Sequence, residues 1–240
     1  MSWAEAASCE PSPEVVSDRE RGGHPVFAAF YAVLGRWAER GPLSERRHEL
    51  LSNALGVTVE VGAGTGLNAL HYGPAVSKVV ATEPDRYMLR RLRRAAAPAR
   101  VPIVVEQAPA EALPLDDSSA DSVVCTLVLC SVPDQDEALR EMMRVLKPGG
   151  RLLFLEHVRS PDPRVARWQD RVERPWGWFA GGCHPNRDSE SAIRAAGFEV
   201  THLERFDLPG PPPVRPHVMG VAAKRTRVER PTDRRHGPMA

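Results

Sequence analysis

Lysine is scarce in this 240-residue sequence: of its 32 basic residues only Lys78, Lys147 and Lys224 are lysines. Basic and acidic residues nearly balance, 32 against 31, which leaves a formal net charge of +1. A chain this close to neutral lacks the positive field that attracts nucleic acids and anionic membranes. We interpret the arginine-rich stretch 86–94 as the solvated face of a single helix. We therefore expect neither nucleic acid nor a stably bound membrane among the partners.

Long apolar runs and paired metal ligands are missing as well. No segment approaches the ~18 apolar residues typical of a membrane-spanning helix, and residues 1–10 lack the apolar centre of a secretion signal. The four cysteines, Cys9, Cys125, Cys130 and Cys183, have no zinc-ligand spacing. Cys125 and Cys130 stand in an apolar run, as buried free thiols do. We therefore expect a soluble, cytoplasmic protein without a metal site, in which Cys130 and Cys183 are structural.

The most informative segment is a glycine-rich turn that directly follows an apolar strand. A β-branched run at 57–61 leads into glycines at three alternate positions, 62, 64 and 66, and a helix-like segment follows at 67–70. Glycine allows the backbone to approach a ligand closely, and the N-terminus of a helix offers unpaired N–H groups to it. This order of elements is typical of a nucleotide-cofactor site. The candidate cofactor contacts in this segment are Glu60, Gly62, Ala63, Gly64, Gly66 and Asn68.

A second apolar strand, 78–82, leads into Glu83 and Pro84. In folds that bind dinucleotides or nucleosides, an acidic residue at this point accepts hydrogen bonds from the ribose hydroxyls. A carboxylate accepts from both vicinal hydroxyls at once. The alternative is a solvated acid in the turn before Pro84. Because the glycine-rich turn lies upstream, we predict that Glu83 and Pro84 are cofactor contacts.

Strands and helices alternate from residue 57 onward, which predicts an α/β fold with a parallel sheet covered on both faces. The expected strands are 57–61, 78–82, 101–106, 121–127, 151–156, 198–206 and 217–224. The expected helices are 66–72, 85–96, 134–146 and 189–196, with a shorter piece near 109–113. We expect a single domain over 25–224, with a helical cap at 25–55, between disordered ends at 1–24 and 225–240.

The last two strands are joined by a proline-rich loop, 209–216, with no helix between them. A parallel crossover needs about a dozen residues or more, so these strands should form an antiparallel hairpin at the edge of the sheet. The result is a Rossmann-like, seven-stranded, mostly parallel sheet with a C-terminal antiparallel hairpin. An NAD(P)-dependent oxidoreductase, the alternative from another class, would instead repeat strand–helix units or add a substrate domain.

With this ending, the chain resembles the class I S-adenosylmethionine-dependent methyltransferases over roughly residues 55–224. The segment 60–66 resembles the first motif of that family, and Glu83 resembles its ribose-binding acid. Residues 110–115 resemble the adenine-side motif, and 144–150 the turn before the fifth strand. The resemblance implies S-adenosyl-L-methionine as the cofactor. It adds Ala110, Glu111 and Leu127 to the expected cofactor contacts.

A narrower likeness points to one group within this family. The segments 125–132, 156–158, 182–183, 187–189 and 214–217 are similar to the small animal thiol S-methyltransferases. Those proteins carry an N-terminal hydrophobic membrane anchor, and residues 1–24 contain no such apolar segment. The likeness implies a small-molecule methyl acceptor, and a thiol is the first hypothesis. The alternatives are O- or C-methylation of an aromatic or quinone-like compound and a cofactor-binding module without catalysis.

Two histidines are candidates for catalysis, because substrates of such sheets bind beyond the carboxyl ends of the strands. His157 follows the fifth expected strand, and His184 stands in a segment that is able to fold over the site. Either can act as a general base, since the reference pKa of histidine is close to neutral. A histidine that caps a turn is the alternative. The nearby Trp168, Trp176 and Trp178 either form an apolar lid or pack on the sheet.

Overall fold

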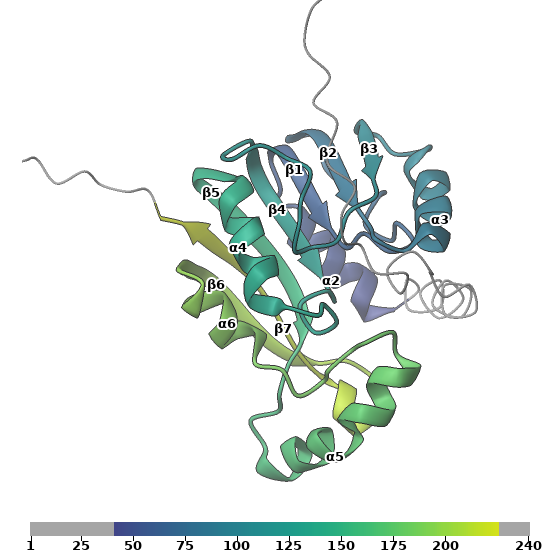
Figure 1. Cartoon of the computed structure of the whole chain (residues 1–240), viewed down its shortest axis with the longest axis vertical. Helices are drawn as coiled ribbons and strands as arrows, with labels where there is room; N and C mark the ends of the chain where they lie inside the picture. Colours follow the sequence, from purple (N-terminus) through teal and green to yellow (C-terminus); the bar gives the residue numbers. More distant parts are fainter. Residues whose placement is uncertain (1–40, 226–240) are drawn as a thin grey trace, which may run out of the picture.

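The structure is a computed structural model that describes residues 41–225. Its centre is a seven-stranded sheet with the strand order β3-β2-β1-β4-β5-β7-β6 (Figure 1). The strands are β1 (Gly56–Val61), β2 (Val76–Thr82), β3 (Ile103–Glu106), β4 (Ala120–Thr126), β5 (Leu146–His157), β6 (Phe198–Asp207) and β7 (Pro216–Lys224). The first five strands run parallel, and β7 pairs antiparallel with both β5 and β6. The predicted fold class and the C-terminal hairpin are confirmed.

Within residues 41–225, four helices begin at an aspartate whose side chain accepts backbone N–H groups of the first turn. Asp85 caps α3 (Arg86–Ala96), Asp134 caps α4 (Gln135–Val145), Asp162 caps α5 (Pro163–Phe179) and Asp188 caps α6 (Ser189–Ala195). Such caps satisfy donors that have no partner within the helix. α2 (Pro42–Leu51) begins with a proline instead, and the short 3-10 helix η1 (Pro212–Val214) lies in the hairpin loop.

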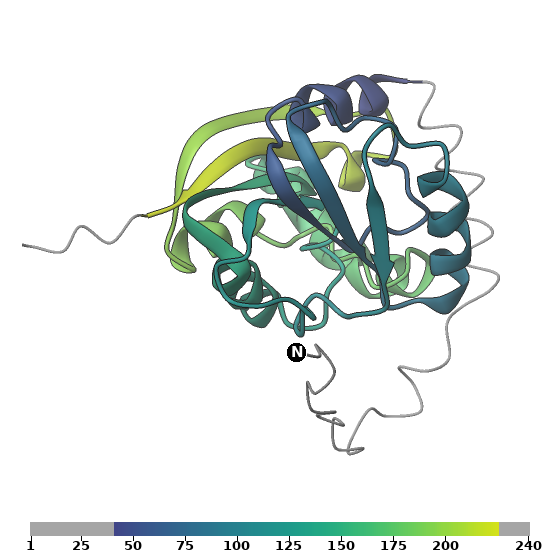
Figure 2. The ribbon, with the colours of Figure 1, turned by 90° about the horizontal axis from the view of Figure 1, so that it is seen from above.

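Among the described residues, two apolar clusters hold α4 and α6 on one face of the sheet and α2 and α3 on the other (Figure 2). Leu139 and Met142 of α4 and Ile193 of α6 pack in one cluster. Leu51 of α2 and Leu92 of α3 pack in the other. β4 and β5 contribute side chains to both clusters, as strands with helices on both faces do. Because the first five strands are parallel, their carboxyl ends share one edge of the sheet, and this edge carries the candidate site.

The segment after β1 differs from the predicted helix at 66–72: residues 64–71 form consecutive turns. The backbone bonds close over three residues, as from Ala69 N to Gly66 O at 3.1 Å. So short a segment gains too few hydrogen bonds to offset the cost of helix nucleation, and Pro74 prevents it from growing. The turn is instead held by side chains of the site.

A helix that the sequence analysis did not predict, α5, follows β5, and a turn replaces the short helical piece expected near 109–113. Pro175 lies inside α5 and removes one backbone donor, which hid the helical pattern. Trp168 and Trp178 on this helix are 54% and 80% exposed. The alternative that these two rings pack on the sheet is therefore wrong. The other alternative, an apolar lid over the site, stays a prediction.

The described part of the predicted helical cap is α2, which ends at Leu51 rather than at residue 55. The predictions for residues 1–24, for the cap between 25 and 40 and for the tail beyond Arg225 lie outside the described residues. Within 41–225, no helix combines the length and the apolar character needed to cross a membrane.

Candidate active site

The turn after β1 requires glycine for its backbone conformation and, at Gly62, for space as well. Gly62, Gly64 and Gly66 have φ angles of +62°, +58° and +86°, which side chains other than glycine rarely adopt. A Cβ atom at Gly62 would lie 2.7 Å from Cγ2 of Val128. Val128 belongs to the loop after β4. The two loops at the carboxyl edge of the sheet are therefore in direct contact.

Beneath this turn, Glu60 anchors a buried polar network. Its carboxylate accepts hydrogen bonds from Asn68 Nδ2 at 3.0 Å and from the Tyr72 hydroxyl at 2.7 Å. Arg47 of α2 donates to Asn68 Oδ1 at 2.8 Å and to Thr126 Oγ1 at 3.0 Å. Burial raises the pKa of Glu60, and the bonds from Tyr72 and Asn68 oppose this shift. The network holds the turn in place, and direct contact of Glu60 and Asn68 with the cofactor stays a prediction.

Glu83 follows β2 and binds the same turn from the neighbouring strand. Its Oε2 accepts from Gly64 N and its Oε1 from Asp85 N, both at 2.9 Å. Burial raises the pKa of Glu83 from 4.5 to about 7, against the effect of these two backbone hydrogen bonds. Pro84 lies next to it, with a carbonyl that accepts from Gln107 Nε2 at 3.0 Å. A carboxylate fixed beside the glycine-rich turn is well placed to accept a ribose diol.

A small cavity of about 20 Å³ opens at the glycine-rich turn. Its lining comprises Arg47, Gly62, Ala63, Gly64, Thr65, Leu67 and Thr126. The hydroxyl of Thr65 is buried and has no hydrogen-bond partner among the described residues. Buried polar groups without a partner are uncommon in proteins, so this hydroxyl indicates a polar ligand. The residues present therefore fit a nucleoside cofactor whose polar groups reach the turn.

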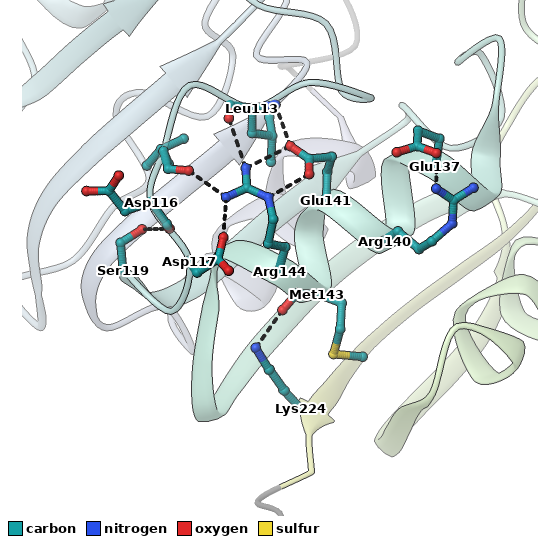
Figure 3. A network of polar contacts seen from close by, with 11 residues as sticks. Leu113, Asp116, Asp117, Ser119, Glu137, Arg140, Glu141, Met143, Arg144 and Lys224 are labelled. Atoms are coloured by element: carbon teal, nitrogen blue, oxygen red, sulfur yellow. Dashed lines mark hydrogen bonds and ion pairs between the residues drawn. The ribbon is translucent and has the colours of Figure 1, made fainter.

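The loop that carries Ala110 and Glu111 is tied to α4 by Arg144 (Figure 3). Arg144 donates to Leu113 O at 3.0 Å and forms an ion pair with Glu141 at 2.6 Å. Glu141 in turn accepts from Leu113 N at 2.8 Å. Ala110 is buried, and the Glu111 carboxylate accepts from a backbone N–H at the start of α4 at 3.3 Å. The expected adenine side is thus a fixed loop, and its contact with adenine stays a prediction.

Glu156, near the end of β5, organises the loop after β4. Its carboxylate is fully buried and accepts the backbone N–H groups of Val128, Leu129 and Cys130 at 3.0, 3.1 and 3.3 Å. Burial raises the pKa of Glu156, and these hydrogen bonds oppose the shift. Leu127, just ahead of them, has a φ of +58°, which is uncommon for a residue with a side chain. One buried carboxylate therefore fixes the loop that contacts Gly62 through Val128.

His157 lies at the end of β5 beside two cysteines. Its Nδ1 is 3.5 Å from Cys183 Sγ and 3.9 Å from Cys130 Sγ, and the two sulfurs are 3.7 Å apart. The hydrogen bond with Cys130, together with the imidazole of His157, lowers the pKa of Cys183, while burial opposes this shift. The His217 ring packs on His157 with centroids 4.3 Å apart, and burial lowers the pKa of His217 to about 3.

Comparison with known proteins agrees with the fold and the glycine-rich turn. Residues 59–154 match the family described as "Methyltransferase domain". The chain is 36% identical over 216 residues to thiol S-methyltransferase TMT1B of Homo sapiens, which covers 82% of this chain and 86% of that protein. The chain belongs to the class I S-adenosylmethionine-dependent methyltransferases. S-adenosyl-L-methionine is its methyl donor.

Two further comparisons agree, one with the family and one with the fold. Thiol S-methyltransferase TMT1B of Rattus norvegicus is 39% identical over 174 residues, which are 69% of this chain and 70% of that protein. The crystal structure of a putative methyltransferase from Bacillus halodurans superposes with a TM-score of 0.62 at 18% identity. The superposition covers 75% of this chain and 99% of the Bacillus halodurans chain. The second likeness shows the fold alone.

The two histidines that the sequence predicted to be catalytic have different side-chain partners in this methyltransferase. His184 Nδ1 pairs with Glu173 of α5 at 2.5 Å, whereas His157 lies in the cysteine cluster. The two segments meet through the backbone, since His184 N donates to Cys130 O at 2.7 Å. A catalytic role for either histidine stays a prediction.

The sequence analysis did not identify Arg47 and Thr65 as residues of the site. It also did not identify the role of Glu156 in fixing the loop after β4. Glu156 had a usable signal, because it is a charged residue directly after the apolar run 152–155 of a central strand. Arg47 had none, since an arginine on an amphipathic helix is usually solvated. In this methyltransferase it is only 3% exposed and reaches the turn.

Proposed function

We propose that this methyltransferase transfers the methyl group of S-adenosyl-L-methionine to the sulfur of a small thiol. The observation that carries the proposal is the 36% identity, over 82% of the chain, to a protein named as a thiol S-methyltransferase. The chemistry of a thiol suits the site. An ordinary thiol has a pKa of ~8.5, so a modest depression yields the reactive thiolate near neutral pH. The proposal includes a cytoplasmic location, which the free cysteines among the described residues support.

The bound cofactor supplies a methyl group activated by the positive charge of a sulfonium. The residues of the chain bind and orient it. Gly62 and Gly64 give the turn its positive φ angles, and Glu83 accepts the ribose hydroxyls. Thr65 offers the buried hydroxyl that has no partner among residues 41–225. Holding the reacting atoms close and aligned can contribute ~7–11 kcal/mol to the rate enhancement of such a displacement.

The acceptor side of the site is formed by the loop after β4 and the end of β5. Val128 touches the glycine-rich turn, and Cys130, two residues further, lies in the cluster with His157 and Cys183. Glu156 fixes this loop through three backbone hydrogen bonds. The cofactor turn and the cluster are therefore joined by a single short, rigid loop. This arrangement supports an acceptor sulfur bound at the cluster.

The test is the transfer of an isotopically labelled methyl group from S-adenosyl-L-methionine to a small alkyl thiol, with a phenol in a parallel reaction. We expect a labelled thioether and an equal amount of S-adenosylhomocysteine, with little label on the phenol. The variant Glu83→Ala is the control for enzyme-dependent transfer and should be strongly impaired at low cofactor concentration. Label on the phenol but not on the thiol would refute S-methylation and support the O-methylation alternative.

A further inference from the structure

Three potential metal ligands converge at the acceptor side of the site. Cys130 comes from the loop after β4, His157 from the end of β5 and Cys183 from the turn after α5. One ligand atom from each lies within 4.8 Å of the other two. The residues are 27 and 26 positions apart in the sequence, so no local spacing indicates the cluster. They meet because the turn after α5 folds back onto the loop after β4, where His184 N donates to Cys130 O.

The distances match a tetrahedral zinc site. With Zn–S bonds of about 2.3 Å and a Zn–N bond of about 2.0 Å, tetrahedral angles place two sulfurs about 3.8 Å apart and a sulfur about 3.5 Å from the nitrogen. In the structure the two sulfurs are 3.7 Å apart, and His157 Nδ1 is 3.5 Å from Cys183 Sγ. The largest departure is the 3.9 Å between Nδ1 and Cys130 Sγ. A shift of a few tenths of an ångström would complete the geometry.

The surrounding structure holds each ligand in place. Glu156 accepts the backbone N–H of Cys130, and the Cys130 carbonyl accepts from His184 N at 2.7 Å, which fastens the Cys183 turn to the same loop. The ring of His217 packs on His157. Cys130 and Cys183 are 1% and 6% exposed, whereas His157 is only partly buried. The cluster is therefore rigid and open to ligands on the histidine side.

We propose that Cys130, His157 and Cys183 bind one zinc ion and leave its fourth coordination position open to the acceptor. Two thiolates and an imidazole are soft and borderline ligands that select zinc over magnesium or calcium. Two thiolate charges balance the charge of a divalent ion, which reduces the cost of burying them. Three protein ligands with an open position are the arrangement of catalytic rather than structural zinc sites.

The role of the open position rests on the proposed thiol S-methylation. An acceptor thiol that coordinates zinc releases its proton to solvent and binds as thiolate. The thiolate sulfur forms a bond to the methyl carbon, and the carbon–sulfonium bond breaks with its electron pair passing to the cofactor sulfur. The anionic acceptor and the cationic donor thus give two neutral thioethers. In this arrangement His157 is a metal ligand, not the general base that the sequence predicted.

The first experiment measures zinc content by atomic absorption after the full-length protein is stripped with a chelator, loaded with zinc and desalted. We expect one zinc per chain in the native protein and its loss in Cys130→Ser and in Cys183→Ser. Cys125→Ser is the matched control, because Cys125 is equally buried but its thiol donates to Glu156 and lies outside the cluster. It should retain zinc. Thermal melts show that each variant is folded.

The second experiment replaces zinc by cobalt and records the absorption spectrum, which does not depend on methyl transfer. We expect thiolate-to-cobalt charge-transfer absorption that is lost in Cys183→Ser, and a change in the visible bands when a small alkyl thiol is added. Zinc retained by both cysteine variants, zinc absent from the native protein, or a Cys130–Cys183 disulfide in its place would overturn the site. A cobalt spectrum unmoved by thiol would overturn the open position. Metal binding without thiol methylation would refute the proposed function and leave the site standing.

Discussion

Cofactor affinity should depend on pH through Glu83. In the free protein burial raises the pKa of this carboxyl from 4.5 to about 7. Ribose hydroxyls donate hydrogen bonds, so they bind the ionised carboxylate and bind its protonated form less well. Cofactor binding therefore favours loss of the proton from Glu83. Affinity should rise as the pH increases through 7 and level off above it.

The magnitude follows from the fraction of Glu83 that is ionised. With a pKa of about 7, roughly one molecule in 100 is ionised at pH 5 and about nine in ten at pH 8. The association constant should thus be at most about 90-fold higher at pH 8 than at pH 5, which is the limit in which the protonated form does not bind. Glu83→Gln removes the charge at every pH. A hydrogen bond to a charged group contributes about 1.5–3 kcal/mol, so this variant should bind roughly 10- to 150-fold more weakly at pH 8.

Isothermal titration calorimetry with S-adenosylhomocysteine, from pH 5 to pH 8, measures both effects without turnover. The native protein should show the rise in affinity, and Glu83→Gln should show a nearly flat profile. The variant also serves as the control for titration of the ligand itself, because that contribution is common to both proteins. A flat profile in the native protein, or the same slope in both, would refute the assignment of Glu83 to the ribose.

Three further predictions concern the loops around the site. Gly62→Ala should lower the free energy of unfolding, measured in urea, by about 1–3 kcal/mol, because its Cβ would lie 2.7 Å from Cγ2 of Val128. The control is Gly73→Ala, where a Cβ meets no atom within 4 Å and the free energy of unfolding should change far less. Glu156→Gln turns an amide NH₂ toward backbone donors, so unfolding free energy should fall by about 1–3 kcal/mol; an unchanged denaturation midpoint would contradict the loop-fixing role. Arg144→Ala should loosen the adenine-side loop and weaken calorimetric cofactor binding several-fold, whereas Arg140→Ala, which removes only an exposed pair with a residue one turn away, should not.

The periodic parts of the sequence predicted the fold well. Apolar strands that alternate with helical segments produced the parallel sheet, and the proline-rich loop between the last two strands, with no helix in it, required the antiparallel hairpin. These features are local or follow from chain connectivity, so neighbouring residues suffice to reveal them. The same holds for the glycine-rich turn, because the positive φ angles at 62, 64 and 66 are a backbone property of each position.

The segment 66–72 and the helix α5 show where local reasoning fails. The first has a helix-like composition, yet it forms turns because Asn68 and Tyr72 bind the buried Glu60. The second contains Pro175, which is normally a helix breaker. In both cases contacts or chain continuity outweighed intrinsic preference, as tertiary context commonly does.

The sequence by itself determined the family, the cofactor and the order of the motifs, since each is written in short contiguous segments. Only the tertiary structure decided which distant side chains meet. Arg47 reaches the glycine-rich turn from α2, Glu156 fixes a loop from the neighbouring strand, and Cys183 joins Cys130 and His157 across the end of α5. Such meetings depend on how helices pack on the sheet, and packing is a sum of many weak contacts between residues far apart in the chain. The chemistry of the acceptor side therefore became visible only in three dimensions.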